Sequence, residues 1–245
     1  MFELAPITVL VGHAGTGKTN VALNLALEEA AQGHKVTLAD LDIVNPYFRS
    51  SDYPELLRDA GVQLIAPVMA RTTLDTPSIS GKLDVAIAQV AEATRLGANP
   101  AQRLIIDVGG DDDGATTIGR FAQALRDAGA RVLYVVSAFR AMTQDPAQAS
   151  AMLPDIEEHA HLCAHAVLNT SNLGDETTLE HVRHGRAFAK EVARLCGLPL
   201  EATVVPQVAV GDQNINDVSE ALTDAEPGAE PLVVMPRLVR TPWDA

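Results

Sequence analysis

The sequence predicts a doubly wound α/β fold, in which helices flank both faces of a mostly parallel sheet. The chain has 245 residues, of which 47% are hydrophobic and 20% are charged, enough for one large domain with a full core. Short apolar runs, many of them β-branched, alternate with longer helical patterns along the chain. Continuous apolar runs are typical of strands that are buried on both faces of a parallel sheet. We therefore expect a three-layer sandwich that forms a single domain over residues 1–245.

The expected strands and helices alternate from the N-terminus onward. The expected strands cover residues 7–11, 36–39, 62–66, 104–108, 132–136, 164–168 and 203–205, and a last apolar piece covers 232–235. The expected helices are rich in Ala, Leu, Glu and Arg, have apolar residues three and four positions apart, and cover 20–32, 84–96, 116–128 and 177–196. This βαβα order favours right-handed crossovers and hence parallel strands.

Charge and composition exclude several classes of function. The net charge of −14 opposes the phosphates of nucleic acids and the anionic lipids of a membrane surface, so we expect neither as a partner. No apolar run is long enough for a membrane span, and the first residues lack the basic region of a signal peptide. The two cysteines, Cys163 and Cys196, are far apart in the sequence and form no metal or redox motif. These features predict a cytoplasmic protein.

The strongest functional signal is the motif G-x-x-x-x-G-K-T, which follows the first expected strand and precedes the first expected helix. Its glycines allow backbone N–H groups to surround a phosphate chain, and the helix N-terminus adds a favourable dipole. Lys18 is expected to contact the β- and γ-phosphates and to take part in catalysis, and Thr19 is expected to bind Mg²⁺. The nucleotide-binding residues of this loop are Gly12, His13, Ala14, Gly15, Thr16, Gly17, Lys18 and Thr19.

Acidic residues at the ends of two other expected strands complete the predicted site. Asp107 is expected to bind Mg²⁺, and the backbone N–H of Gly110 is expected to approach the γ-phosphate. Asp40 and Asp42 share one face at the end of the second strand, and this face points toward the phosphates if the strand lies beside the first. We assign Asp42 to orient the attacking water and Asp40 to the Mg²⁺ site. Helix capping by Asp107 and an Asx turn before Pro46 are the structural alternatives.

Three motifs together, the phosphate-binding loop, Asp-Leu-Asp and Asp-Val-Gly-Gly, resemble the MinD/ParA and CobQ/CobB class of P-loop ATPases in the SIMIBI group. The resemblance covers most of the chain. It implies that Asp42 lies in the first switch segment and that Asp107 to Gly110 form the second. It also implies base recognition near Asn169 and an adenine contact at Pro206. An ATPase of this class binds ATP and Mg²⁺, forms a nucleotide-dependent homodimer and acts as a switch on a protein partner.

The chain departs from this class at the phosphate-binding loop. Many members carry a signature lysine directly after the first glycine, and this lysine reaches the phosphates of the partner subunit. The chain has His13 at that position, and a neutral or partly charged imidazole supplies no fixed positive charge. Arg49 is a candidate replacement, although a solvated surface side chain is the interpretation that we favour. The chain also lacks the basic amphipathic tail of membrane-attached members.

Two further patterns bear on ligands. Residues 169–172 read Asn-Thr-Ser-Asn, without the aspartate by which many GTPases recognise guanine, so ATP is favoured over GTP. The segment 159–165 places three histidines and Cys163 at alternate positions, which could bind zinc or nickel on one face of a strand. That face would have to leave the core, so we do not favour a metal site there.

From these features we expect a Mg²⁺-dependent ATP-hydrolysing switch of the MinD/ParA type that acts on an unidentified protein partner. One alternative is a biosynthetic enzyme similar to dethiobiotin synthetase or the cobyrinic acid amidases, in which the nucleotide phosphorylates a small carboxylate bound near residues 71–75. Another is a metallochaperone ATPase that gates delivery to a second enzyme. Hydrolysis in the absence of a small acid would favour the switch.

Overall fold

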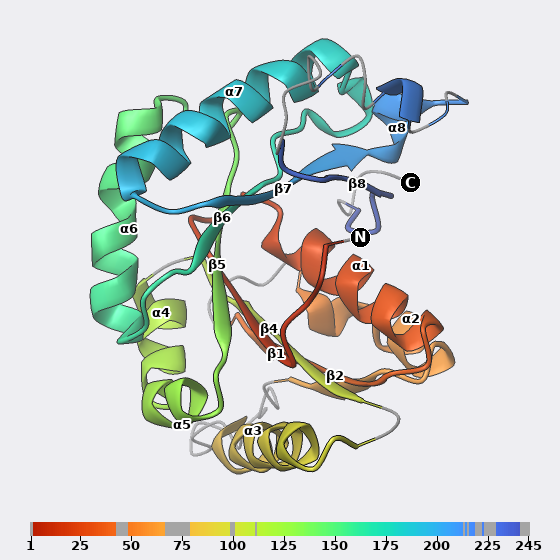
Figure 1. Cartoon of the computed structure of the whole chain (residues 1–245), viewed down its shortest axis with the longest axis vertical. Helices are drawn as coiled ribbons and strands as arrows, with labels where there is room; N and C mark the ends of the chain where they lie inside the picture. Colours follow the sequence, from red (N-terminus) through yellow and green to blue (C-terminus); the bar gives the residue numbers. More distant parts are fainter. Residues whose placement is uncertain are drawn as a thin grey trace.

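The computed structural model describes residues 2–42, 49–66, 79–98, 101–110, 112–212, 214, 216–218, 222 and 229–240. Within them, eight parallel strands form one sheet with helices on both faces (Figure 1). The strands are β1 (Ile7–Val11), β2 (Lys35–Leu41), β3 (Gln63–Ile65), β4 (Gln102–Val108), β5 (Arg131–Val136), β6 (Ala166–Asn169), β7 (Leu200–Pro206) and β8 (Leu232–Met235). The helices are α1 (Lys18–Ala31), α2 (Pro54–Asp59), α3 (Ile79–Arg95), α4 (Asp112–Gly119), α5 (Ala122–Asp127), α6 (Pro146–Ala160), α7 (Leu179–Cys196) and α8 (Gln207–Val210), with 3-10 turns η1 (Ser50–Asp52) and η2 (Gly174–Glu176).

The strand order, β3-β2-β4-β1-β5-β6-β7-β8, places β1 between β4 and β5. The chain therefore winds outward from β1 in two directions, and in open α/β sheets the crevice beyond the carboxyl ends of the strands at such a point binds ligands. The strand β4 also separates β1 from β2, because Leu10 and Asp40 are both register partners of Asp107. The second strand does not lie beside the first, so its acidic end meets the phosphate-binding loop only across β4.

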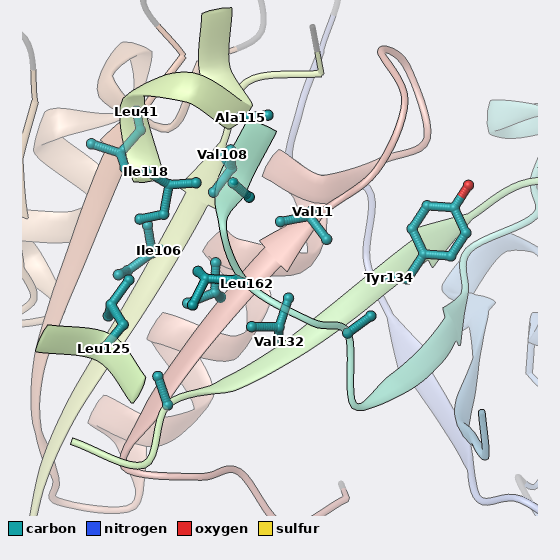
Figure 2. Packing of buried hydrophobic residues seen from close by; sticks show 14 of the residues in the cluster. Val11, Leu41, Ile106, Val108, Ala115, Ile118, Leu125, Val132, Tyr134 and Leu162 are labelled. Atoms are coloured by element: carbon teal, nitrogen blue, oxygen red, sulfur yellow. The ribbon is translucent and has the colours of Figure 1, made fainter. Parts of the chain in front are cut away.

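Alternate strand residues pack into two hydrophobic layers, one on each face of the sheet. Val9 packs into the layer that α3 to α7 cover, and the next residue, Leu10, packs into the layer beneath α1 and α2. Figure 2 shows part of the first layer, in which Ile118 of α4 and Leu125 of α5 lie near Ile106 of β4. Coverage of both faces explains why the strands read as continuous apolar runs. Within the described residues, no helix is long and apolar enough to cross a bilayer.

The expected strands are all present: 7–11 and the last apolar piece, 232–235, have the expected bounds, and the others have shifted ends. Three of the four expected helices correspond to α1, α3 and α7. The expected helix 116–128 is instead two helices, α4 and α5. The helix α4 ends at Gly119, where a Cβ atom would lie 2.7 Å from the carbonyl oxygen of His159 in α6. This close approach between two helices requires a glycine.

The helix α6 was not predicted, although its start carries clear signals. Asp145 caps it by accepting the N–H of Ala147 at 2.7 Å, and Pro146 follows in the first turn. The helix contains His159 and ends at Ala160, and the C-cap residue His161 has a left-handed backbone with φ of 51°. The segment 159–165 is therefore no alternating strand, and among the described residues no group of three His, Cys, Asp or Glu side chains is placed to bind a metal.

Candidate functional site

A cavity of about 910 Å³ lies beyond the carboxyl end of β1. This volume is in the range of sites for small-molecule ligands. Its walls come from the phosphate-binding loop and α1, from the ends of β2 and β4, from the loops after β5 and β6, and from the C-terminal part of the chain. The lining residues are Ala14, Gly15, Gly17, Lys18, Thr19, Asn20, Val21, Asp42, Gly110, Arg140, Thr170, Asn172, Gly174, Asp175, Val204, Pro206, Gln207, Val208, Met235, Pro236, Arg237 and Val239.

The phosphate-binding loop turns sharply at three glycines. Gly12, Gly15 and Gly17 have φ values of 148°, 75° and 89°, which other residues rarely adopt. A Cβ atom on Gly12 would also lie 2.4 Å from the carbonyl oxygen of Val135 in β5. Gly17 occupies the N-cap of α1 without a capping side chain, and the first turn of α1 contains no acid. The backbone N–H groups of this turn, with their positive dipole, therefore suit an anion in the cavity.

Lys18 is buried and folds back onto its own loop. Its Nζ donates to the carbonyl oxygens of Gly12 at 2.7 Å and His13 at 2.9 Å. The hydroxyl of Thr16 donates to the same His13 oxygen at 2.9 Å. These bonds hold the loop in a closed turn around the lysine, with the ammonium group at the cavity wall.

Two buried carboxylates lie side by side on β2 and β4, and Asp107 is the one that meets the loop, at Thr19. Asp40 and Asp107 are register partners on β2 and β4, and their exposed fractions are 0% and 2%. The Oδ2 of Asp107 accepts a hydrogen bond from Ser50 Oγ at 2.7 Å, and the hydroxyl of Thr19 also donates to this carboxylate. Asp40 accepts the backbone N–H groups of Asp42 at 3.0 Å and Ser51 at 2.9 Å.

This arrangement raises the pKa of both carboxyl groups. Burial, followed by repulsion from Asp40, raises the pKa of Asp107 to about 7, although Ser50, Lys18 and Thr19 oppose the shift. Burial also raises the pKa of Asp40, and its hydrogen bonds to Ser51 oppose the shift. Two carboxylates and a hydroxyl are hard oxygen ligands that suit Mg²⁺, and a divalent cation would relieve their repulsion. The structure thus brings together Thr19, Asp40 and Asp107, the predicted Mg²⁺ ligands.

The remaining acid of this region, Asp42, is partly exposed and lines the cavity, whereas the described lining does not include Asp40. Gly110 also lines it and lies directly against the phosphate-binding loop. A Cβ atom on Gly110 would be 2.4 Å from the Cα and 2.5 Å from the backbone nitrogen of Ala14. The contact between the two loops therefore has room only for a glycine. The alternative substrate loop, 71–75, lies outside the described residues.

At the other end of the cavity, the two residues predicted to contact the base have different positions. Pro206 lines the cavity beside Val204 and Val208. Asn169 is 1% exposed and does not line it, because its Oδ1 accepts the N–H of Ser171 at 3.1 Å and its Nδ2 donates to Thr203 at 3.3 Å. The cavity is lined instead by the residues that follow Asn169, of which Asn172 and Asp175 have polar side chains and Thr170 a buried hydroxyl.

The C-terminal segment forms a wall of the cavity that the sequence did not predict. Asn20 of α1 accepts the N–H of Leu238 at 2.8 Å, and Asn24 donates to Pro236 at 3.1 Å. Arg237 forms an ion pair of 3.0 Å with Asp175, which joins this segment to η2. These contacts connect residues that are far apart in the chain, and no local pattern announces them.

Three basic side chains bear on the charge of the missing lysine: His13 and Arg49, which the sequence suggests, and Arg140. His13 lies on the outside of its loop, with Nδ1 3.0 Å from the carbonyl oxygen of Ala14, and the described cavity lining does not include it. The surface interpretation of Arg49 is wrong, because its exposed fraction is 6%. Its backbone N–H donates to Asp52 at 3.0 Å, in the 3-10 turn η1. Arg140 does line the cavity.

Comparisons with known proteins support the fold and leave the family open. The sequence matches no protein-family profile and no curated protein. The cell division protein FtsY from Thermotoga maritima has a similar structure, with a TM-score of 0.53 and 19% identity over 82% of this chain and 62% of that chain. For FtsY from Mycoplasma mycoides the TM-score is 0.52, with 17% identity over 91% and 67% of the two chains.

A third similar structure is the signal recognition particle 54 kDa protein from Aeropyrum pernix in complex with GDP. Its TM-score is 0.51, with 17% identity over 91% of this chain and 49% of that chain. The chain thus spans less than two thirds of the Thermotoga protein and about half of the Aeropyrum protein. At this level of identity the likeness concerns the architecture: the chain has the α/β fold of P-loop nucleoside triphosphatases, with an eight-stranded parallel sheet between helices.

Proposed function

We propose that the chain is a Mg²⁺-dependent ATP-binding and ATP-hydrolysing switch of the MinD/ParA type. The observation that carries the proposal is the meeting of the phosphate-binding loop, which lines a cavity of about 910 Å³, with the buried carboxylate of Asp107 and its neighbour Asp40. Lys18 would donate to the β- and γ-phosphates together with the first N–H groups of α1. Thr19, Asp107 and Asp40 would hold Mg²⁺, which neutralises charge on the phosphate oxygens when bound.

Hydrolysis needs a group that orients water. Of the two acids in the described cavity wall, Asp175 pairs with Arg237 at 3.0 Å, so we assign Asp42 to accept a hydrogen bond from the water. Gly110 adjoins the loop at Ala14, which places its backbone beside the phosphate end of the cavity. The carboxylate of Asp42 is separate from the buried pair on β2 and β4. The roles of binding metal and orienting water are therefore assigned to different residues.

The base would lie between apolar walls at the far end of the cavity. Pro206, Val208 and Met235 supply apolar surface for a purine ring. Asn172 uses its amide within its own turn, donating to Thr170 at 2.8 Å and accepting the N–H of Gly174 at 3.0 Å. Asn172 carries no carboxylate for the edge of a guanine, and the carboxylate of Asp175 is paired with Arg237 at 3.0 Å, which supports ATP. The GDP in the Aeropyrum structure supports GTP as the competing nucleotide.

The wider biological role is part of the same proposal. We propose an unidentified protein partner, a nucleotide-dependent homodimer, and no binding to nucleic acids or membranes, since the net charge is −14. Cys163 and Cys196 are free thiols in the structure, which supports a reducing compartment such as the cytoplasm.

Calorimetry with Mg·ATP and Mg·GTP tests the proposal directly. Lys18→Ala removes a charged donor to the phosphates, and such hydrogen bonds contribute about 1.5 to 3 kcal/mol, so the affinity should fall by about one to two decades. Lys35→Ala is the control, because Lys35 is exposed at the opposite end of β2. Equal affinity of the Lys18 variant and the wild type would refute the site. Hydrolysis that occurs only with a small carboxylic acid would favour the biosynthetic alternative.

A further inference from the structure

A second positively charged side chain reaches the phosphate-binding loop from the other side of the cavity. Arg140 follows β5 and packs on Gly15, where a Cβ atom would lie 3.5 Å from Nε and 3.6 Å from Cδ of the arginine. Both residues line the cavity. The guanidinium group therefore lies against Gly15 of the loop that we assign to the phosphates.

One nitrogen of the Arg140 guanidinium group lacks a hydrogen-bond acceptor among the described residues. Its Nε is buried, and among the described residues no acceptor forms a hydrogen bond with it. Burial also lowers the pKa of Arg140. A buried donor on a charged group is costly without an acceptor, and a rearrangement of the Arg140 side chain onto an anionic ligand in the cavity would supply one. Arg237, another arginine of the cavity wall, already pairs with Asp175 at 3.0 Å.

The segment that carries Arg140 is held from several directions. The N–H of Ala138 donates to Ser171 Oγ at 2.9 Å, and Thr143 Oγ1 donates to the carbonyl oxygen of Ser137 at 3.0 Å. The ring of Phe139 packs against two histidine rings of α7, each with a centroid distance of 5.6 Å. A side chain on a fixed segment loses little further freedom when it binds a ligand.

We propose that Arg140 binds the phosphate chain of the nucleotide and supplies, from the same subunit, the positive charge that the loop lacks at His13. The inference rests on the proposed function, since it assigns a residue to the same site. Its guanidinium can donate two parallel hydrogen bonds to phosphate oxygens, which a histidine at the outside of the loop does not provide. Arg140 stays protonated and transfers no atom; it acts by attracting the phosphates.

The test compares three ligands by calorimetry: Mg·ATP, adenosine and tripolyphosphate, which carries the phosphates without a base. We expect Arg140→Ala and Arg140→Gln to weaken Mg·ATP and tripolyphosphate by about 10- to 100-fold, with adenosine binding unchanged. Arg140→Lys should recover part of the loss, because it restores the charge without the planar fork. Arg95→Ala is the control, since this side chain is 68% exposed on α3.

The outcomes separate this inference from the function on which it rests. If Lys18→Ala loses tripolyphosphate while Arg140→Ala and Arg140→Gln bind it like the wild type, nucleotide binding stands and the role of Arg140 is refuted. If the Arg140 variants lose adenosine as strongly as tripolyphosphate, the residue shapes the cavity and does not contact phosphate, which also refutes the inference. If the wild type binds neither tripolyphosphate nor any nucleotide, both the proposed function and the inference on Arg140 are refuted.

Discussion

Replacement of Asp107 by asparagine should stabilise the protein at pH 8 in the absence of metal and nucleotide. Burial and the neighbouring Asp40 raise the pKa of Asp107 from 3.8 to about 7. Between these two values the folded state binds a proton that the unfolded state has released. The free energy of unfolding therefore falls as the pH rises from about 4 to 7, and this contribution is constant above about 7.

The magnitude follows from the two pKa values. One pKa unit corresponds to about 1.4 kcal/mol, so the raised pKa of Asp107 costs the folded state about 4 kcal/mol at pH 8, where the buried group is ionised, and about 1 to 2 kcal/mol at pH 5, where it is protonated. Asparagine avoids this cost, and its Oδ1 can still accept the hydrogen bond that Ser50 donates at 2.7 Å. The difference in unfolding free energy between variant and wild type should thus grow by about 3 kcal/mol from pH 5 to pH 8.

Urea unfolding in EDTA at a series of pH values measures this difference. Asp59→Asn is the matched control, because this aspartate side chain is 72% exposed and should show no such growth. Mg·ATP should reverse the order of stability, since it binds the wild type more tightly than a variant without the carboxylate. A difference between Asp107→Asn and the wild type that stays constant within 1 kcal/mol from pH 5 to pH 8 would show that the carboxyl group is not held as the structure indicates.

Three further predictions concern the loop contact, the acid that we assign to orient water and a buried ion pair. Gly110→Ala would place a Cβ atom 2.4 Å from Ala14 Cα, so the loop must move and the calorimetric affinity for Mg·ATP should fall at least about tenfold. Asp42→Ala should keep this affinity and slow phosphate release in a hydrolysis assay, because Asp42 is assigned to water. Arg186→Met should lower the unfolding free energy in urea by about 3 to 5 kcal/mol, since it leaves Glu230, which is 4% exposed, without its partner at 2.5 Å.

A specific experimental result would contradict each of these three predictions. Gly81→Ala, where no atom lies within 4 Å of the added Cβ, is the control for Gly110→Ala, and equal affinities of the two variants would reject the contact. Hydrolysis by Asp42→Ala at the wild-type rate would mean that another group positions the water. An Arg186→Met variant as stable as the wild type would show that Glu230 is solvated or protonated in the folded protein.

The strands and the phosphate-binding loop could be predicted because their signals are local. A run such as 132–136 is hydrophobic at every position, which is typical of a strand covered on both faces. The glycines of the loop reflect backbone angles that other residues rarely adopt, and Lys18 follows them at a fixed spacing. Local signals also mark the start of α6, where Asp145 caps the helix and Pro146 follows.

The sequence by itself thus determined the fold class, the phosphate-binding loop and the acids beside it, while the tertiary structure decided how they meet. The insertion of β4 between β1 and β2 depends on hydrogen bonds between distant segments, and it makes Asp40 a neighbour of Asp107 and not of the loop. The burial of Asn169 and the approach of Arg140 to Gly15 likewise depend on long-range packing. Composition and periodicity describe which face of an element is apolar, but the partners of that face are set by free energies of packing over the whole chain.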